Sequence, residues 1–315
     1  MSIDREAIRR ALGDAVSFDH RVAALTTYRV GGAAAVFVRV DDESRLALVA
    51  SVAAEHSLPI VVIGRGSNML VSDRGFPGLM VQFGDFATGI EVGLDSEVTA
   101  GAAVLLPVLA RRTAAAGLTG FEWAVGVPGS VGGAVCMNAG GHGSDMRASL
   151  VEARVLDWRD GTTRVIASTE LGLRFRGSAI GEERAVISAH LRLAPGDRAT
   201  SEATIEEIVR WRRENQPGGQ NAGSVFVNPV PGEVAAGELI DRCGLRGFRI
   251  GSAEVSTKHA NFIQSDVGGT AADVVAVMSH VRGVVADKTG HMMRSEIRLV
   301  GFDTTFDETP RVPVS

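Results

Sequence analysis

The stretch Phe121–Gly143, FEWAVGVPGSVGGAVCMNAGGHG, is the most informative part of the sequence for the fold and the function. It holds seven glycines in 23 residues and no acidic side chain after Glu122. Glycine permits positive φ angles, and its small size lets backbone N–H groups approach a bound anion. Oriented N–H groups can neutralise a diphosphate without a buried lysine or arginine. Close packing of a buried turn would also favour glycine, so both explanations stay open here.

The composition is that of a globular protein without an extended charged surface. The chain has 315 residues, enough for two or three domains, and 45% of them are hydrophobic. The net charge of −5 disfavours a general polyanion binder, so we expect no nucleic-acid partner. No segment resembles a signal peptide or a membrane span. The two cysteines, Cys136 and Cys243, form no CxxC pair, which suits a reducing compartment. We expect a cytoplasmic monomer with no membrane partner.

Hydrophobic periodicity predicts a mixed order of helices and short strands before and after the glycine-rich stretch. Helices are predicted over residues 3–16, 46–56, 105–117, from about 201, 234–243 and 271–288. Strands are predicted over residues 34–40, 59–63, 79–83, 89–93, 96–104, 151–158, 163–166, 185–193 and 294–300. Residues 26–32 and 64–68 are predicted loops, and the second follows a strand as phosphate-binding loops do, although many such loops only turn the chain. The chain after residue 302 is predicted to fray.

Several well-known site motifs are missing from the sequence. It has no GxGxxG after a strand, no GxxxxGK[ST] and no GxSxG. It also has no HExxH and no paired CxxC, and its seven histidines are dispersed, so we expect no metal site. A dinucleotide would have to bind outside the Rossmann scheme.

Six motifs nevertheless occur in a defined order. They are RGSNML at 65–70, VGVPGSVGGAVCMNAG at 125–140, RFRGS at 174–178, NAGSVFVNP at 221–229, AGELIDRCGLRG at 236–247 and SEIRLVG at 295–301. Each is weak alone, but the ordered set closely resembles the UDP-N-acetylenolpyruvoylglucosamine reductase family of peptidoglycan precursor synthesis. The resemblance covers nearly the whole chain, from about Thr26 to Gly301.

The resemblance implies an α+β fold of the vanillyl-alcohol-oxidase (PCMH) type. Two lobes would bind FAD, and a C-terminal α/β domain would bind a UDP-sugar. Residues 1–75 would form the first lobe, joined by the strand at 294–301, and residues 76–197 the second. Residues 198–293 would form the substrate domain and residues 302–315 a tail.

The resemblance also implies two half-reactions. NADPH gives a hydride to FAD, and the reduced flavin gives it to the enolpyruvyl ether of the UDP-sugar, whose neighbouring carbon takes a proton. Ser224 would donate the proton. Arg176 would hold the substrate carboxylate and stabilise the aci form that develops there, and Glu296 would stabilise the same intermediate. Without the resemblance these residues would be interpreted as a turn serine, an exposed charge and an edge-strand charge.

The binding residues implied by the resemblance come from several loops. The FAD-binding positions are Tyr28, Arg29, Gly31, Gly64, Arg65, Gly66, Ser67, Asn68, Met69, Leu70, Val127, Pro128, Gly129, Ser130, Gly132, Gly133, Asn138 and Ala139. The substrate-binding positions are Asn228, Lys258 and His259. Lys258 would meet the diphosphate, unless it is only a solvated surface lysine.

The sequence departs from the family pattern at three places. One branch of the family has an inserted loop with a tyrosine that closes over the substrate, whereas Tyr28 is the only tyrosine here. The chain therefore resembles the shorter branch. Many relatives have lysine where this chain has Asn215, and either Arg212 or Arg213 is a candidate to replace that charge. Val227 also stands where relatives often have lysine.

Two other functions are compatible with parts of the sequence. One is an FAD-dependent oxidase or dehydrogenase of the same superfamily, for which His142 would offer a covalent flavin attachment. The other is a nucleotide-sugar binding protein without catalytic activity. NAGSVFVNP and SEIRLVG favour the reductase, and the joint presence of Arg176, Ser224 and Glu296 argues against a non-catalytic protein.

Overall fold

The computed structural model describes residues 3–303 and 306–308. The chain forms two compact units, each assembled from segments that are distant in sequence. Unit 1 comprises Met1–His20, Ala35–Arg65 and Pro77–Arg212, and unit 2 comprises Arg21–Ala34, Gly66–Phe76 and Arg213–Ser315. The division into two FAD-binding lobes and a substrate domain stays a prediction.

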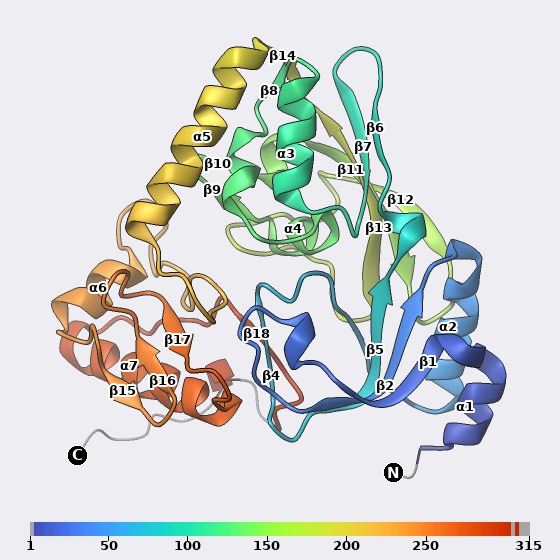
Figure 1. Ribbon diagram of the computed structural model, residues 1–315, viewed down its shortest axis with the longest axis horizontal. Coiled ribbons are helices and arrows are strands. Elements are labelled where there is room, and N and C mark those ends of the chain that lie inside the picture. Colours follow the sequence, from blue (N-terminus) through green and yellow to red (C-terminus); the bar gives the residue numbers. More distant parts are fainter. Residues whose placement is uncertain (1–2, 304–305, 309–315) are drawn as a thin grey trace. The chain divides into compact units, whose positions relative to one another are not determined.

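One sheet of unit 1 has four strands in the order β1-β2-β5-β3. These strands are β1 (Val16–Arg21), β2 (Ala33–Val40), β3 (Ile60–Val62) and β5 (Phe76–Phe83). β3 and β5 run parallel. Helices α1 (Arg5–Leu12) and α2 (Leu46–Glu55) lie beside this sheet (Figure 1) and bury their apolar side chains in the core of the unit.

The other large sheet of unit 1 is antiparallel, with the order β12-β11-β13-β7-β6. Its strands are β6 (Ile90–Val92), β7 (Glu97–Gly101), β11 (Leu150–Asp157), β12 (Thr163–Ala167) and β13 (Arg184–Arg192). Helix α4 (Val131–Met137) packs against β13 and β7. The unit also contains α3 (Leu106–Ala115), most of α5 (Arg198–Asn215), and the short pairs β8 (Leu118–Thr119) with β14 (Ala194–Pro195) and β9 (Gly140–Gly141) with β10 (Ser144–Asp145).

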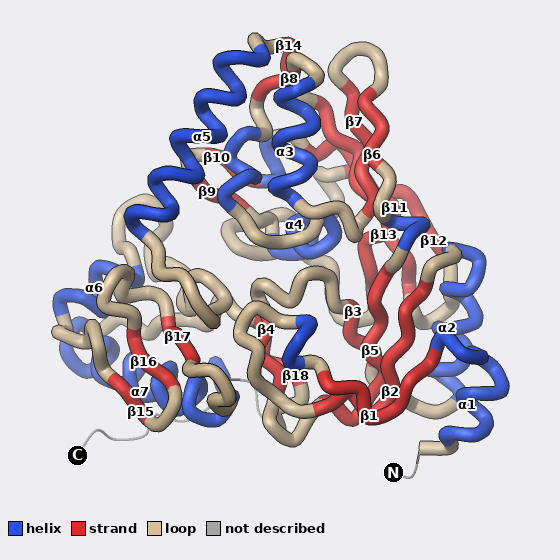
Figure 2. Tube along the Cα trace, viewed as in Figure 1, coloured by secondary structure: helices blue, strands red, loops and turns tan. Residues whose placement is uncertain are grey.

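Unit 2 combines a three-stranded antiparallel sheet with two helices. The sheet contains β15 (Arg249–Ile250), β16 (Ala253–Val255) and β17 (Ile263–Ser265), and helix α7 (Ala271–Thr289) packs on it. Helix α6 (Ala236–Arg242) contacts α7. A parallel pair, β4 (Met69–Val71) with β18 (Arg298–Val300), lies among the loops of this unit, as Figure 2 shows. The pair joins an early segment of the chain to a late one.

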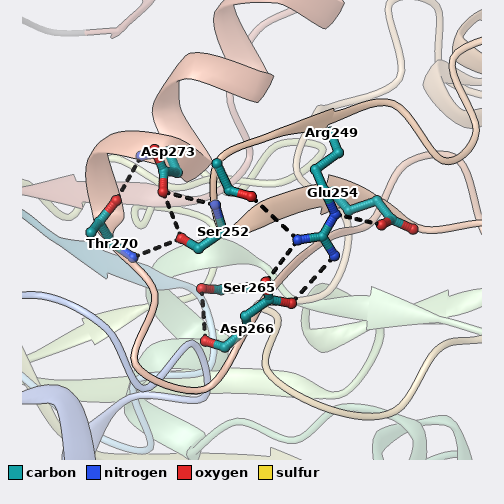
Figure 3. Close-up of polar contacts among 8 residues, drawn as sticks. Arg249, Ser252, Glu254, Ser265, Asp266, Thr270 and Asp273 are labelled. Carbon is teal, nitrogen blue, oxygen red and sulfur yellow. Dashed lines mark hydrogen bonds and ion pairs between the residues drawn. The ribbon is translucent and has the colours of Figure 1, made fainter.

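Polar side chains tie the start of α7 to this three-stranded sheet (Figure 3). Asp273 accepts hydrogen bonds from the N–H and the Oγ of Ser252, at 2.9 and 2.6 Å, while the Thr270 N–H donates to Ser252 Oγ at 3.0 Å. Nearby, Arg249 pairs with Glu254 and Asp266. These bonds hold the N-terminus of α7 against the turn between β15 and β16.

Most of the predicted elements are confirmed by the structure. The strands expected at residues 34–40, 151–158 and 185–193 correspond to β2, β11 and β13 within one residue at each end. The helices expected at 46–56 and 271–288 correspond to α2 and α7. Thr270 caps α7 by accepting from the Asp273 N–H, and Gly290 ends it at φ 77°. Such caps make helix ends readable from sequence. No helix among the described residues is long and apolar enough to cross a membrane.

Two predicted elements have the wrong bounds, and two short elements were not predicted. The helix expected over residues 3–16 ends at Leu12, because Gly13 adopts φ 67° and the chain then enters β1. The glycine-rich stretch contains helix α4 instead of being one continuous loop. Met69 and Leu70 form strand β4. The final strand begins at Arg298 rather than 294, since Ser295 bridges to Phe226 instead.

The C-terminal segment also differs from the expectation of fraying, as far as it is described. Residues Phe306–Glu308 form a short 3₁₀ turn, and Phe306 is buried. Arg282 of α7 donates hydrogen bonds to the carbonyls of Phe306 and Asp307 at 2.6 and 2.9 Å. The remainder of the predicted tail, residues 304–305 and 309–315, lies outside the described residues.

Candidate functional site

In unit 1 the loop that carries Arg176 is joined to the loop that carries Asn138. The Asn138 side-chain amide donates to the Arg174 carbonyl at 3.1 Å and to Asp145 at 2.9 Å. Its oxygen accepts from the Arg147 N–H at 2.9 Å, and Asn138 itself ends α4 in the left-handed conformation, at φ 40°. The structure therefore brings together a position predicted to bind FAD and a position predicted to be catalytic.

Arg176 is held in an unusual backbone conformation. Its φ is 54°, a region in which a residue with a Cβ pays a steric cost. The guanidinium donates to the Gly140 carbonyl at 3.0 Å and lies 4.9 Å from the centroid of the Phe175 ring. Strained residues of this kind cluster at functional sites, because the surrounding structure must hold them. The structure therefore holds the Arg176 side chain against the Gly140 carbonyl and the Phe175 ring.

The start of the loop 64–70 meets the glycine-rich stretch at Ser130, within unit 1. A Cβ added to Gly64 would lie 2.3 Å from Ser130 Oγ. In α4, a Cβ on Gly132 would lie 2.9 Å from the Cβ of Ala102, and the N–H groups of Val131 and Gly132 donate to the carbonyls of Val104 and Ala102. Glycine at 132 therefore serves close packing, and these two N–H groups are already used within the protein.

In unit 2 the rest of that loop runs beside the segment 26–32. The Thr27 N–H donates to the Gly66 carbonyl at 3.3 Å, and the Gly32 N–H to the Ser72 carbonyl at 2.8 Å. A Cβ on Gly66 would lie 2.3 Å from the Leu25 carbonyl oxygen, and one on Gly31 2.4 Å from that of Val71. The two early sequence stretches predicted to bind FAD are therefore neighbours, and glycine is required where their backbones touch.

Tyr28 and Thr27 carry buried polar atoms in the same place. Tyr28 is fully buried in the hydrophobic core of unit 2, and burial raises the pKa of its hydroxyl. Within the described chain, neither Tyr28 OH nor Thr27 Oγ1 has a hydrogen-bond partner, although both atoms are buried. A buried polar atom without a partner is costly. Because Thr27 as a residue is only partly buried, its Oγ1 is the candidate to be satisfied by a ligand.

Ser224 and Glu296 lie on adjacent backbone segments of unit 2. Ser224 forms an antiparallel bridge with Phe262, and the next residue, Val225, accepts a hydrogen bond from the Glu296 N–H at 2.7 Å. The Asn68 amide donates to the Glu296 carbonyl at 3.0 Å. Thus one residue of the predicted FAD loop and two predicted catalytic residues belong to one hydrogen-bonded arrangement, whereas Arg176 belongs to unit 1.

The three positions predicted to bind substrate also belong to unit 2. Asn228 accepts a hydrogen bond from the Ala236 N–H at 3.0 Å and so holds the first turn of α6. Lys258 is exposed, and its ammonium group donates to the Arg213 carbonyl. His259 is partly buried, and its Nδ1 accepts from the Asn261 N–H at 3.2 Å. Burial, and next the positive charge of Arg246, lower the pKa of His259, so a neutral ring with Nε2–H is favoured.

One residue of this region, Asn261, was not predicted from the sequence. Asn261 is 4% exposed, and its side-chain amide bonds both the N–H and the carbonyl of Phe226. Its signal was only its place in the STKHANF stretch, two residues after His259.

The candidates to replace the family's lysine were Arg212 and Arg213. Burial lowers the pKa of Arg212, which lies in unit 1 near His142. His142 packs edge-on against Trp211. Among the described residues, no His, Cys, Asp and Glu side chains are grouped as a metal would need.

Comparisons with known proteins agree with the order of these motifs. Residues 215–300 match the model of the C-terminal domain of UDP-N-acetylenolpyruvoylglucosamine reductase, and residues 34–167 match that of an FAD binding domain. The chain is 41% identical to the UDP-N-acetylenolpyruvoylglucosamine reductase of Heliobacterium modesticaldum over 278 residues, which cover 88% of each chain. It is 42% identical to that of Gloeobacter violaceus, over 89% of this chain and 94% of that one.

This chain belongs to the UDP-N-acetylenolpyruvoylglucosamine reductase family. The crystal structure of the Thermus caldophilus reductase matches its fold with a TM-score of 0.77 at 32% identity, over 90% of this chain and 98% of that one. The predicted α+β flavoprotein fold is thereby confirmed, with the FAD binding domain within unit 1 and parts of unit 2. Like the other members of the reductase family, the chain is an FAD-dependent oxidoreductase.

The residues present fit FAD. The predicted loops have glycine where a second backbone approaches closely, at Gly31 and Gly66, and where the Ser130 side chain does, at Gly64. The orphaned Thr27 Oγ1 lies in the same stretch. Since Val131 and Gly132 use their N–H groups internally, an anion at this point would have to be met by neighbouring amides such as those of Ser130 and Gly133.

Proposed function

We propose that the protein reduces the enolpyruvyl group of UDP-N-acetylglucosamine enolpyruvate to give UDP-N-acetylmuramate, with NADPH as the reductant. The observation that carries this proposal is the adjacency of Ser224 and Glu296, each within a motif of the reductase family, through the Glu296 N–H to Val225 carbonyl bond. The product is a peptidoglycan precursor, and we place the enzyme in the cytoplasm as a monomer.

FAD would be held by the backbone of Gly64–Leu70, Val127–Gly133 and Asn138–Ala139, together with Tyr28, Arg29 and Gly31. When bound, FAD supplies the hydride, taken from NADPH, that adds to one carbon of the enolpyruvyl double bond. Because the Tyr28 ring is fully buried, this residue would contribute its backbone or its position rather than an exposed side chain.

The protein's own side chains supply the proton and stabilise the charge. The Ser224 hydroxyl gives its proton to the neighbouring carbon and regains one from solvent, so one hydride and one proton add across the bond. Arg176 binds the substrate carboxylate, for which a planar guanidinium is suited. Glu296 stabilises the charge that develops on the same side. His259 donates Nε2–H to the substrate, Asn228 holds the α6 turn beside it, and Lys258 meets the diphosphate.

The test separates the two half-reactions in the FAD-loaded protein. NADPH should bleach the flavin absorbance anaerobically, and UDP-N-acetylglucosamine enolpyruvate should restore it. Ser224→Ala should keep the bleaching and slow the restoration by about 10²- to 10⁴-fold, the range for a general acid. Restoration by oxygen alone, with no effect of the UDP-sugar, would refute the proposal in favour of an oxidase.

A further inference from the structure

The segment that carries Ser224 is not part of a regular sheet, although its backbone is extended. On one side the Val225 N–H donates to the Asn261 carbonyl at 2.8 Å, and Ser224 bridges to Phe262. On the other side Phe226 bridges to Ser295, and the Val227 N–H donates to the Arg294 carbonyl at 2.9 Å. Ser224 is therefore positioned by single contacts rather than by a long strand ladder.

The Asn261 side chain makes the two hydrogen bonds to the Phe226 backbone that a neighbouring strand would otherwise make. Its Nδ2 donates to the Phe226 carbonyl at 2.8 Å, and its Oδ1 accepts from the Phe226 N–H at 3.0 Å. A carboxamide has a donor and an acceptor in the geometry of a peptide group, which no other short side chain offers. Phe226 itself is 1% exposed, so its backbone groups have no solvent to bond if the amide is removed.

Asn261 is in turn fixed by the stretch predicted to bind substrate. Its N–H donates to His259 Nδ1, and the Phe262 N–H donates to the His259 carbonyl at 3.0 Å. The Ser256 N–H donates to the Phe262 carbonyl at 2.8 Å. A single buried side chain thus joins the turn around His259 to the residues directly after Ser224.

We propose that Asn261 is the positioning residue for Ser224: its amide fixes the backbone at Phe226 and thereby the direction in which the serine hydroxyl faces the substrate. This inference rests on the proposed role of Ser224 as proton donor. Asn261 touches no reacting atom in this scheme, and its effect on the reaction passes entirely through the segment 224–226.

The isosteric variant Asn261→Asp tests the proposal in the FAD-loaded protein. Once ionised, an aspartate keeps the acceptor for the Phe226 N–H but replaces the donor to the Phe226 carbonyl by a second acceptor. Because burial raises the pKa of a carboxyl group, the rates are compared at alkaline as well as neutral pH. We expect flavin reduction by NADPH to stay within about twofold, and flavin reoxidation by the UDP-sugar to fall by about 10- to 100-fold, as misplacement of a catalytic group does. Equal slowing of both half-reactions would overturn the proposal.

A double-mutant cycle tests whether Asn261 acts through Ser224. If it does, Ser224→Ala combined with Asn261→Asp reoxidises no more slowly than Ser224→Ala alone. If the fold-losses in reoxidation rate of the two single variants multiply in the double variant, Asn261 does not act through Ser224, and its proposed role is overturned while that of Ser224 is not. If Ser224→Ala reoxidises at the normal rate, the proposed proton donor is wrong, and the inference about Asn261 is wrong with it.

A readout independent of activity and a matched control complete the experiment. Amide hydrogen exchange of the peptide containing residues 225–227 should accelerate in Asn261→Asp, and should not accelerate in Asp273→Ala. The control removes a carboxylate that accepts two hydrogen bonds from Ser252 elsewhere in unit 2, within the cluster of Figure 3. If Asp273→Ala has the same thermal stability as Asn261→Asp and slows reoxidation as much, the slowing comes from general destabilisation and the proposal is overturned. Should Asn261→Asp not fold, Asn261→Gln, which keeps both amide groups but moves them by one methylene, provides the same comparison.

Discussion

The Glu296 N–H donates to the Val225 carbonyl at 2.7 Å. The residue directly after Ser224, the candidate proton donor, is therefore bonded to the backbone of Glu296, the candidate for stabilising the developing charge. Each of these two segments has a second support: Asn261 for Val225 and Asn68 for Glu296. Backbone bonds of this kind do not depend on the side chains at 224 and 296. Substitutions there can therefore be interpreted as chemical changes at a preserved backbone.

Glu296→Gln tests the charge at that position. The amide keeps the size of the side chain but cannot carry a negative charge or a carboxylic proton. We expect reoxidation of the flavin by the UDP-sugar to fall by about 10²-fold, with reduction by NADPH unchanged, measured by anaerobic rapid-mixing absorbance. Glu254→Gln, which removes the negative charge from an ion pair with Arg249 in the same unit, serves as the control and should leave both rates unchanged. An unaffected reoxidation rate in Glu296→Gln would exclude a role for the carboxyl group.

Arg176→Gly and Arg176→Ala form a matched pair at the residue with φ 54°. Both variants lack the guanidinium and should lose reoxidation to the same extent. Only alanine keeps a Cβ in the left-handed region, so the glycine variant should be more stable by about 1 kcal/mol. Denaturant unfolding of the two variants measures this difference. Equal stabilities would show that the backbone at 176 relaxes and that no strain is stored there.

Gly66→Ala should damage FAD binding more than an ordinary glycine substitution does. A Cβ at this position would lie 2.3 Å from the Leu25 carbonyl, in addition to the cost of φ 59°. Gly290→Ala is the control, because Gly290 also has a positive φ, 77°, but nothing lies within 4 Å of its Cβ. We expect the control to lose about 1 kcal/mol of unfolding free energy and to retain its flavin. Gly66→Ala should lose more stability and release FAD on gel filtration; equal retention would argue against the loop as a cofactor site.

His259 should make stability depend on pH in one direction. Because burial lowers its pKa in the folded state, the unfolded chain takes up the proton first as the pH falls below about 6.5. The unfolding free energy should therefore be highest above this pH and should decrease as the solution is acidified, until the folded form is protonated too. His259→Asn, which keeps an acceptor for the Asn261 N–H, should show a shallower decrease. Parallel curves from denaturant titrations over this range would show that His259 is not the source.

The sequence predicted elements well where both ends carry a local signal. Helix α7 is marked by Thr270 and Gly290, and the buried strands of unit 1 by their runs of branched apolar residues. It failed where the decisive contact is distant. Nothing around Ser295 shows that its segment bridges to Phe226 instead of extending β18, and nothing around Gly132 shows that its neighbour is Ala102.

The residues of the candidate site were likewise predictable only where they lie in a recognisable motif. Motif order was sufficient to select Ser224, Glu296 and Arg176 as candidates, since each lies inside a distinctive stretch. Asn261 was missed because an asparagine next to a histidine has no periodicity and no motif that distinguishes a buried amide from a surface one. Its importance becomes visible only when both of its hydrogen-bonding groups are found on one buried residue, Phe226.

The composition of unit 2 from separate segments has a consequence for biosynthesis. Asp73 caps α7 through the N–H groups of Ala271 and Ala272, and Asn68 bonds Glu296, which is 228 residues later in the chain. At about 5–20 residues per second, a ribosome makes residues 66–76 many seconds before their partners. Residues 66–72 can bond the earlier segment 26–32 at once, but strand β4 has to remain without its partner strand β18 until the end of synthesis. We therefore expect nascent-chain misfolding and chaperone dependence to concentrate at β4.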